Sequence, residues 1–149
     1  MLSPARVGRF IAAFQKIPRN IIFQSLLGFG VPEISASLDC LASPLHHMCF
    51  GPRYSVLLEI VGPYYHPFRH GVNVMDRDGK TTHILFYDPF DVYYHPTGFF
   101  PLPIPLSACL KPGNFILLLD AHWHFFLDGT TGVRIDDLSD VRFILNSMN

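Results

Sequence analysis

The pattern of hydrophobic and polar positions changes near residue 54. Before that point, large apolar side chains recur at three- and four-residue steps, at Val7, Phe10, Ile11, Phe14 and Ile17. This is the spacing of a half-buried helix. Ser3 suits the N-cap, Pro4 suits the first helical position, and Pro18 should end the helix. We therefore predict a helix over 4–16, followed by irregular structure with one or two short helices.

From Tyr54 onward, apolar residues alternate with polar ones or form short runs, which is typical of strands. The predicted strand segments are YSVLLEIV, GVNVMD, KTTHILFYD, NFILLLD continuing into HWHFFL, GVRI and DVRFIL. Gly62-Pro63 should end the first of them. Gly79 and Gly129 each follow an aspartate between two such segments, which predicts two tight antiparallel hairpins.

Residues 88–106 contain five prolines and many aromatic residues. Proline cannot donate a ladder hydrogen bond, so we exclude a central strand here. The segment is predicted to be a long surface crossing. Its aromatic side chains must either pack back onto the fold or form an exposed apolar patch of the kind that marks an interface.

These elements predict an all-β fold: a small OB-like β-barrel of five or six strands, preceded by a partly helical N-terminal arm. The arm is assigned to residues 1–52 and the barrel domain to residues 53–149. The 149 residues suffice for one core, and 49% of them are hydrophobic while only 15% are charged, so the chain is not a disordered one.

Charge is distributed unevenly. The first 32 residues contain no acid and four bases, Arg6, Arg9, Lys16 and Arg19. From Arg53 to the end, seven basic residues stand against ten acidic ones. The barrel therefore lacks the positive field that recruits phosphates, and we expect nucleic acid to be a poor partner.

The sequence favours an intracellular protein, cytoplasmic or nuclear. Its three cysteines, Cys40, Cys49 and Cys109, have no C-x-x-C spacing, and no apolar run approaches 18 residues, so we expect neither a disulfide framework nor a membrane span. The acid-free N-terminal arm also has the character of a mitochondrial presequence, although a short docking helix is the simpler interpretation.

Three polar clusters are candidates for chemistry. Asp120, His122 and His124 alternate along one predicted strand, so they should share a face and could ligate a metal, although a polar outer face explains them better. Nucleophilic chemistry at Cys49 beside His46 and His47 would need a base and a lowered thiol pKa, and neither is visible.

Aspartates near the turns form the third cluster: Asp76, Asp78, Asp136, Asp137 and Asp140. They are best explained as turn residues that accept backbone hydrogen bonds. No phosphate-binding loop or nucleophile elbow is present. We therefore expect no enzyme activity and no cofactor.

Part of the chain resembles a known family. The segments YSVLLEIVGP, VMDRDGK, ILFY, LKPGN and AHWHFFLDGTTGVRIDDLSDV, preceded by VPEISASLDCLASP, are similar to the β-rich domain that precedes the zinc finger in fungal MYND-type proteins. The likeness covers residues 30–145. The finger itself is absent, so zinc does not carry over, and the resemblance implies a fold and an interaction or scaffolding role.

The leading functional hypothesis is a non-enzymatic protein-interaction module of unknown oligomeric state. Its binding surface would be the crossing 88–106 together with the loop 63–70, through Tyr64, Tyr65, Phe68, Phe90, Tyr93, Tyr94, Phe99 and Phe100. The alternative is a single-stranded nucleic-acid-binding OB-fold, for which only the N-terminal arm could supply cations. A metal-dependent hydrolase around His122 and His124 is an outlier.

Overall fold

A computed structural model describes residues 3–18, 34–41, 54–88, 92–95, 102–121 and 123–146. The predicted N-terminal helix is confirmed as α1, Pro4–Gln15, with Ser3 as its N-cap. The Ser3 hydroxyl accepts a hydrogen bond from the backbone N–H of Arg6 at 3.3 Å, which satisfies one of the free donors of the first turn.

The fold is mostly β, as expected, and is built on one large mixed sheet with the strand order β10-β7-β2-β3-β4-β9-β8. Its strands are β2 (Tyr54–Pro63), β3 (His70–Met75), β4 (Thr81–Phe86), β7 (Phe115–Ala121), β8 (His124–Phe125), β9 (Thr131–Ile135) and β10 (Val141–Ile144). Within the described ranges the sheet has eight strands, more than the five or six expected, and two of them have only two residues. A two-residue strand, β1 (Ile34–Ser35), pairs in parallel with β2.

The two ends of this strand order come from neighbouring parts of the chain. β9 pairs in parallel with β4, whereas β10 pairs antiparallel with β7. Only residues 136–140, which include the single 3₁₀ turn Leu138–Asp140, separate β9 from β10. The Asp137 carboxylate accepts the Ser139 N–H at 2.9 Å and so fixes this turn, as expected for a turn aspartate.

β2 is longer than predicted. It continues through Gly62 to Pro63, and its register with β3 shifts between Ile60 and Gly62. Such a bulge bends a strand without ending it, and proline is tolerated at a strand end, where it need not donate to the ladder. The breaker residues therefore bend β2 instead of terminating it.

Both predicted hairpins form. Gly79 and Gly129 have φ of 92° and 89°, the left-handed conformation that glycine adopts without strain. At the first turn, Asp76 is fully buried, and its Oδ1 accepts the N–H groups of Asp78 and Lys80 at 2.9 and 2.8 Å. Its Oδ2 accepts the Leu38 N–H at 2.9 Å, which ties segment 34–41 to the hairpin.

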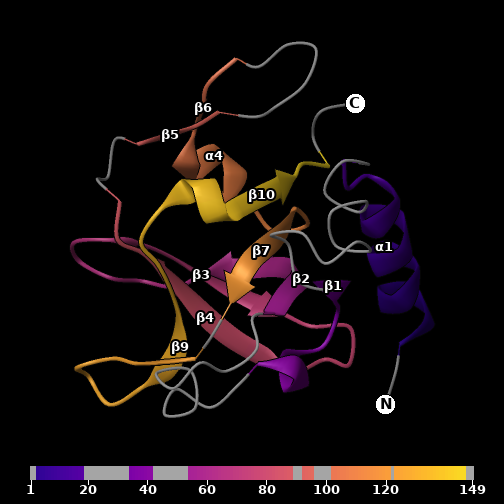
Figure 1. The fold of residues 1–149 in the computed structure, drawn as a ribbon, viewed down its shortest axis with the longest axis horizontal. Helices are drawn as coiled ribbons and strands as arrows, with labels where there is room; N and C mark the ends of the chain where they lie inside the picture. The colour runs from indigo at the N-terminus through magenta and orange to yellow at the C-terminus, as the bar shows by residue number, and fades with distance from the viewer. Residues whose placement is uncertain are drawn as a thin grey trace.

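α1 covers one part of the outer surface of the sheet. Phe10, Ala13 and Ile17 pack there on side chains of β2, β7 and β10, which are Leu57, Phe115, Leu117 and Ile144. The rings of Phe10 and Phe115 meet edge to face at 4.9 Å. The opposite surface of the same strands faces the larger core. Figure 1 shows α1 at the right of the sheet and β9 at the left, so the two lie on opposite sides of the molecule.

The proline-rich crossing stays outside the main sheet, as predicted. Its described parts hold β5 (Tyr93–Tyr94) and β6 (Ile104–Pro105), which pair with each other and lead into α4 (Leu106–Cys109). Figure 1 shows this small hairpin at the top of the molecule. Among the helices described here, none is long and apolar enough to cross a bilayer.

Candidate functional site

Two segments contact β4 on the side of the molecule opposite α1, and the first lies above the second in Figure 1. They are the β2–β3 loop, residues 64–69, and the β8–β9 hairpin, residues 124–130 (Figure 1). His83 of β4 lies between them: its ring stacks on Tyr64 at 4.1 Å with 11° between the planes, and lies 5.2 Å from the ring of Phe126. We call this region the aromatic face. It comprises Tyr64, Tyr65, His66, Phe68, His83, His124 and Phe126, together with Phe125, which points to the other side of β8 from His124, and Leu127 in the turn.

Two glycines let the segments approach this closely. A Cβ on Gly132 would lie 2.7 Å from the His83 carbonyl oxygen and 2.9 Å from its ring atoms. A Cβ on Gly71 would lie 2.5 Å from the Tyr64 carbonyl oxygen. Both positions therefore need a residue without a side chain, and this requirement fixes how the loop and the hairpin sit around His83.

His83 is only 8% exposed, and this burial lowers its pKa, while the carboxylate of Asp128 acts in the opposite direction. The Asp128 pKa is itself lowered, first by hydrogen bonds from Thr130 and then by the charges of His83 and His66. Thr130 donates from its hydroxyl to Asp128 Oδ1 at 2.6 Å and from its backbone N–H at 2.9 Å. The hairpin tip is thus held by internal hydrogen bonds.

The outermost side chains of the aromatic face are large and apolar. Tyr65 and Phe68 of the loop are 86% and 77% exposed, and Phe125 and Leu127 of the hairpin are 60% and 109% exposed. Exposed apolar groups gathered on neighbouring segments mark interaction sites. The loop residues belong to the surface that the sequence predicted, whereas the hairpin residues were missed as binding groups because their alternation indicated only a strand.

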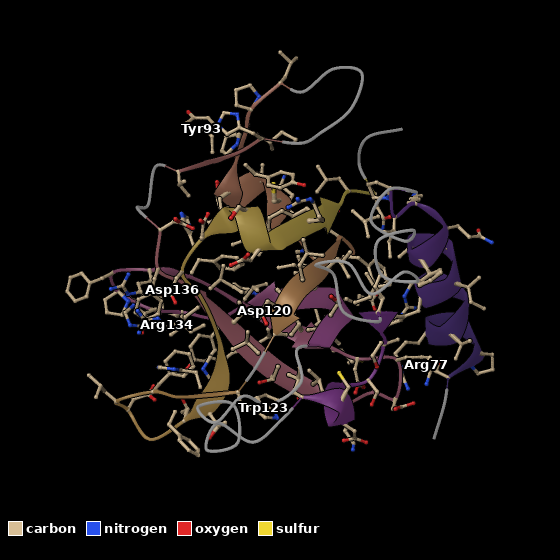
Figure 2. The ribbon with its side chains drawn as sticks, viewed as in Figure 1. Arg77, Tyr93, Asp120, Trp123, Arg134 and Asp136 are labelled. Carbon is tan, nitrogen blue, oxygen red and sulfur yellow. The ribbon has the colours of Figure 1, made fainter. Side chains whose placement is uncertain are left out.

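Cations adjoin this face. The guanidinium groups of Arg69 and Arg134 lie 3.7 and 3.9 Å from the ring centroid of Tyr87, which follows β4. Arg69 also donates from Nη1 to the Tyr87 carbonyl at 3.3 Å, and Arg134 pairs with Asp136 at 2.7 Å. Figure 2 shows Arg134 and Asp136 together on the left of the molecule. Stacking on Tyr87 holds both arginine side chains beside the aromatic residues.

Two arginines in the described part of the N-terminal arm, Arg6 and Arg9, make their contacts elsewhere. The Arg9 guanidinium forms two hydrogen bonds with the carboxylate of Glu59, at 2.7 and 3.1 Å. Arg6 donates from Nε to the Arg77 carbonyl at 2.9 Å, and Figure 2 places Arg77 on the right, beside α1. These two arginines fasten the helix to the sheet, while Arg19 lies outside the described residues.

The two tyrosines in the described part of the crossing differ in exposure. Tyr93 is half exposed and stands on β5, well apart from Arg134 in Figure 2. Tyr94 is buried: its ring packs edge to face on Phe143 at 5.0 Å, and its hydroxyl accepts the Phe143 N–H at 3.4 Å. Phe90, Phe99 and Phe100 lie outside the described residues.

The predicted ligand row on one strand is interrupted. β7 ends at Ala121 and β8 begins at His124, so Asp120 and His124 belong to different strands, and His122 lies outside the described residues. His124 instead packs edge to face on Phe126 at 4.8 Å. Within the part of the chain that the structure describes, no three potential ligands converge on a metal position.

The described cysteines have structural surroundings. Burial raises the pKa of the Cys109 thiol to about 12, which keeps it a protonated core residue. Burial also raises the pKa of the half-buried Cys40 thiol. The cluster of His46, His47 and Cys49 lies outside the described residues.

Comparisons with known proteins give structural neighbours only. No family model matches the chain, and no curated protein matches it. Schizosaccharomyces pombe Pot1pC bound to single-stranded DNA is similar with a TM-score of 0.40 and 9% identity, over 74% of this chain and 90% of that one. Fission yeast Pot1 with single-stranded DNA has a TM-score of 0.44 and 11% identity, over 77% of this chain and 41% of that one.

A murine DNA-binding protein bound to double-stranded DNA gives a TM-score of 0.39 and 11% identity, over 86% of this chain and 52% of that one. The chain thus spans about half or less of the length of two of these neighbours. All three structures contain DNA. This finding contradicts two of our expectations: that a protein-interaction module is the leading interpretation, and that nucleic acid is a poor partner.

Proposed function

We propose that this chain binds single-stranded nucleic acid through the aromatic face. The observation that carries the proposal is the meeting of the β2–β3 loop and the β8–β9 hairpin. They present exposed aromatic rings, and two arginines lie beside them. Unstacked bases offer flat apolar faces to aromatic rings, and arginine contacts the phosphates or stacks on the bases. The proposal involves no catalytic step.

The strand pairing supports an OB-type barrel as the scaffold for this activity. β2, β3 and β4 follow one another, β2 also pairs with β7, and β9 returns in parallel to β4. If β9 and β10 form one interrupted final strand, that strand joins β4 to β7 and closes the barrel. In OB-folds the second and third strands, with the loops after the first and fourth strands, hold oligonucleotides.

The proposed face coincides with that region. In this scheme β3 and β4 are the second and third strands, and the β2–β3 loop follows the first. The β8–β9 hairpin follows the fourth. Tyr65, Phe68 and Phe125 therefore stand where an OB-fold would meet a strand of nucleic acid.

Electrostatics defines the expected mode of binding. The aromatic face has two arginines beside it, and one of them, Arg134, is paired with Asp136. Attraction to phosphates is therefore limited, and stacking has to supply most of the affinity. Stacking of one base on an aromatic side chain contributes about 1–3 kcal/mol. We expect modest affinity, weak dependence on salt and little sequence preference.

The test is fluorescence anisotropy with a labelled oligothymidine of about 12 nucleotides at low salt. Phe68→Ala and Phe125→Ala should each weaken binding by about 5- to 100-fold, because each removes one stacking platform. Tyr93→Ala is the matched control, since it removes an exposed aromatic ring from β5, outside the face. Binding that is absent, or that falls equally in all three variants, would contradict the proposal.

A further inference from the structure

We infer that His83 is the positioning residue of the aromatic face: it holds the β2–β3 loop and the β8–β9 hairpin together, and its protonation releases them. The inference rests on the proposed function, because it concerns how the same face keeps its shape. It adds a specific regulation, namely that mild acid should weaken binding of single-stranded nucleic acid.

His83 makes the contacts that join the two segments. In the described sheet, β8 pairs with β9 alone, so no ladder of backbone hydrogen bonds connects the hairpin to the β2–β3 loop. The imidazole bridges this gap: it stacks on Tyr64 at 4.1 Å and lies 5.2 Å from Phe126. One ring therefore contacts a residue of each segment, Tyr64 of the loop and the buried Phe126 of the hairpin.

A hydrogen-bonded relay connects the same ring to the hairpin tip. The Thr130 hydroxyl lies 3.4 Å from His83 Nε2 and 2.6 Å from Asp128 Oδ1. Because the carboxylate can only accept, the hydroxyl hydrogen points to Asp128, and the hydroxyl oxygen is left to accept from His83. The neutral ring thus carries its hydrogen on Nε2.

Protonation acts against this arrangement. Tyr64 stacks on the ring from the loop, and the charge of Asp128 acts on it from the hairpin. The two segments also carry His66, which contacts Phe68, and His124, which contacts Phe126. Asp128 is the one group among these that favours a charged imidazole, and burial outweighs it. When the segments separate, the ring gains water and its pKa returns toward the ordinary 6.5.

The sign of the pH effect follows. The closed arrangement is fully stable above pH 6.5, and this stability is lost as the pH falls through the lowered pKa of His83. Surface histidines such as His66 would act in the opposite direction, because added positive charge strengthens phosphate binding. A fall in affinity with acid therefore distinguishes His83 from ordinary electrostatics.

The first measurement uses the whole chain without nucleic acid. Imidazole ¹⁵N spectra should show His83 as the Nε2–H tautomer, titrating below pH 6.5. Trp123, the one tryptophan of the chain, directly precedes the hairpin, and its fluorescence should change with the same midpoint. His83→Phe, which keeps a flat ring, should abolish this change, whereas His66→Gln and His124→Gln should retain it.

The second measurement follows affinity for the same oligothymidine from about pH 7.5 to about pH 5. The unmodified chain should lose affinity as the pH falls, whereas His83→Phe, whatever its affinity at the higher pH, should show no such loss. Affinity that rises steadily with acid in both proteins would overturn the inference, as would a His83 ring that titrates normally.

Two further results keep the conclusions separate. Thr130→Val leaves the ring in place and removes the relay, so it should shift the Trp123 midpoint, and an unchanged midpoint contradicts the relay. If the unmodified chain binds no oligothymidine at any pH, the proposed function fails. The ring and Trp123 titrations then still decide whether His83 joins the two segments.

Discussion

The outer surface of the sheet carries aromatic side chains at both ends. Those beneath α1 are buried, and those at the other end are exposed. Beneath α1, Phe115 is fully buried by Phe10, and the nearby arginine, Arg9, is neutralised by Glu59. At the other end, Phe68 and Phe125 remain in solvent, with arginines beside them. The same residue types therefore build a core where a helix covers them and a candidate binding surface where none of the described elements does.

The largest expected effect lies at the covered end. Phe10→Ala should lower the free energy of unfolding by about 4 kcal/mol, because it removes a buried ring and leaves a cavity against Phe115. Ile11→Ala, on the exposed side of the same helix, should change it by less than about 0.5 kcal/mol. Urea denaturation measures both, and equal losses would mean that α1 is not anchored by Phe10.

A smaller loss is expected where the hairpin meets His83. Gly132→Ala places a methyl group 2.7 Å from the His83 carbonyl oxygen and should destabilise the fold by about 2–3 kcal/mol. It should also weaken oligothymidine binding, because the hairpin must move away. Gly62→Ala is the matched control, since its Cβ would meet nothing within 4 Å. Thermal melts that show the same shift for both variants would contradict the close approach.

The next prediction concerns the stability that the ion pair between Arg9 of α1 and Glu59 of β2 contributes. Arg9→Gln should reduce stability by about 2 kcal/mol, because it leaves the Glu59 carboxylate, which is only 5% exposed, without its charged partner. Lys80→Gln breaks the exposed pair with Asp39 and should leave the urea midpoint unchanged. Neither variant should alter affinity for oligothymidine, and a loss of affinity in Arg9→Gln would implicate the arm in binding.

The smallest effect concerns the arginines at the uncovered end. If Arg69 and Arg134 each contact one phosphate, the logarithm of the binding constant should fall with the logarithm of salt with a slope of about −1.4. Each Arg→Gln substitution should make this slope shallower by about 0.7. Arg142→Gln, on β10, serves as the control. A much steeper slope in the unmodified chain would mean that charge, not stacking, dominates.

The sequence predicts the elements whose signals are local. Ser3-Pro4 marks the start of α1, and the Asp-Gly pairs at Gly79 and Gly129 mark the hairpins, because capping and left-handed turns depend on one or two neighbouring residues. The strand signal also holds for β2, whose end was misjudged since a bulge at Gly62 bends the strand instead of stopping it.

The site depends on contacts between distant residues, and these leave no local pattern. Tyr64, His83 and Phe126 come from three separate elements, and nothing near His83 in the sequence indicates that it joins the other two. The sequence predicted that the arm would provide cations, because basic residues can be counted without knowing which acidic residues pair with them. Glu59, fifty residues away, accounts for the charge of Arg9.

The buried carboxylate of Asp76 couples the β3–β4 turn to segment 34–41, so the two should unfold together. One carboxylate accepts the two N–H groups that close the β3–β4 turn and the N–H of Leu38 from a separate segment. The turn cannot loosen without also releasing residues 34–41. These amides should therefore exchange with deuterium as a single cooperative unit, so that a segment with only the two-residue strand β1 and one 3₁₀ turn, Leu38–Cys40, is as well protected as the hairpin to which it is tied.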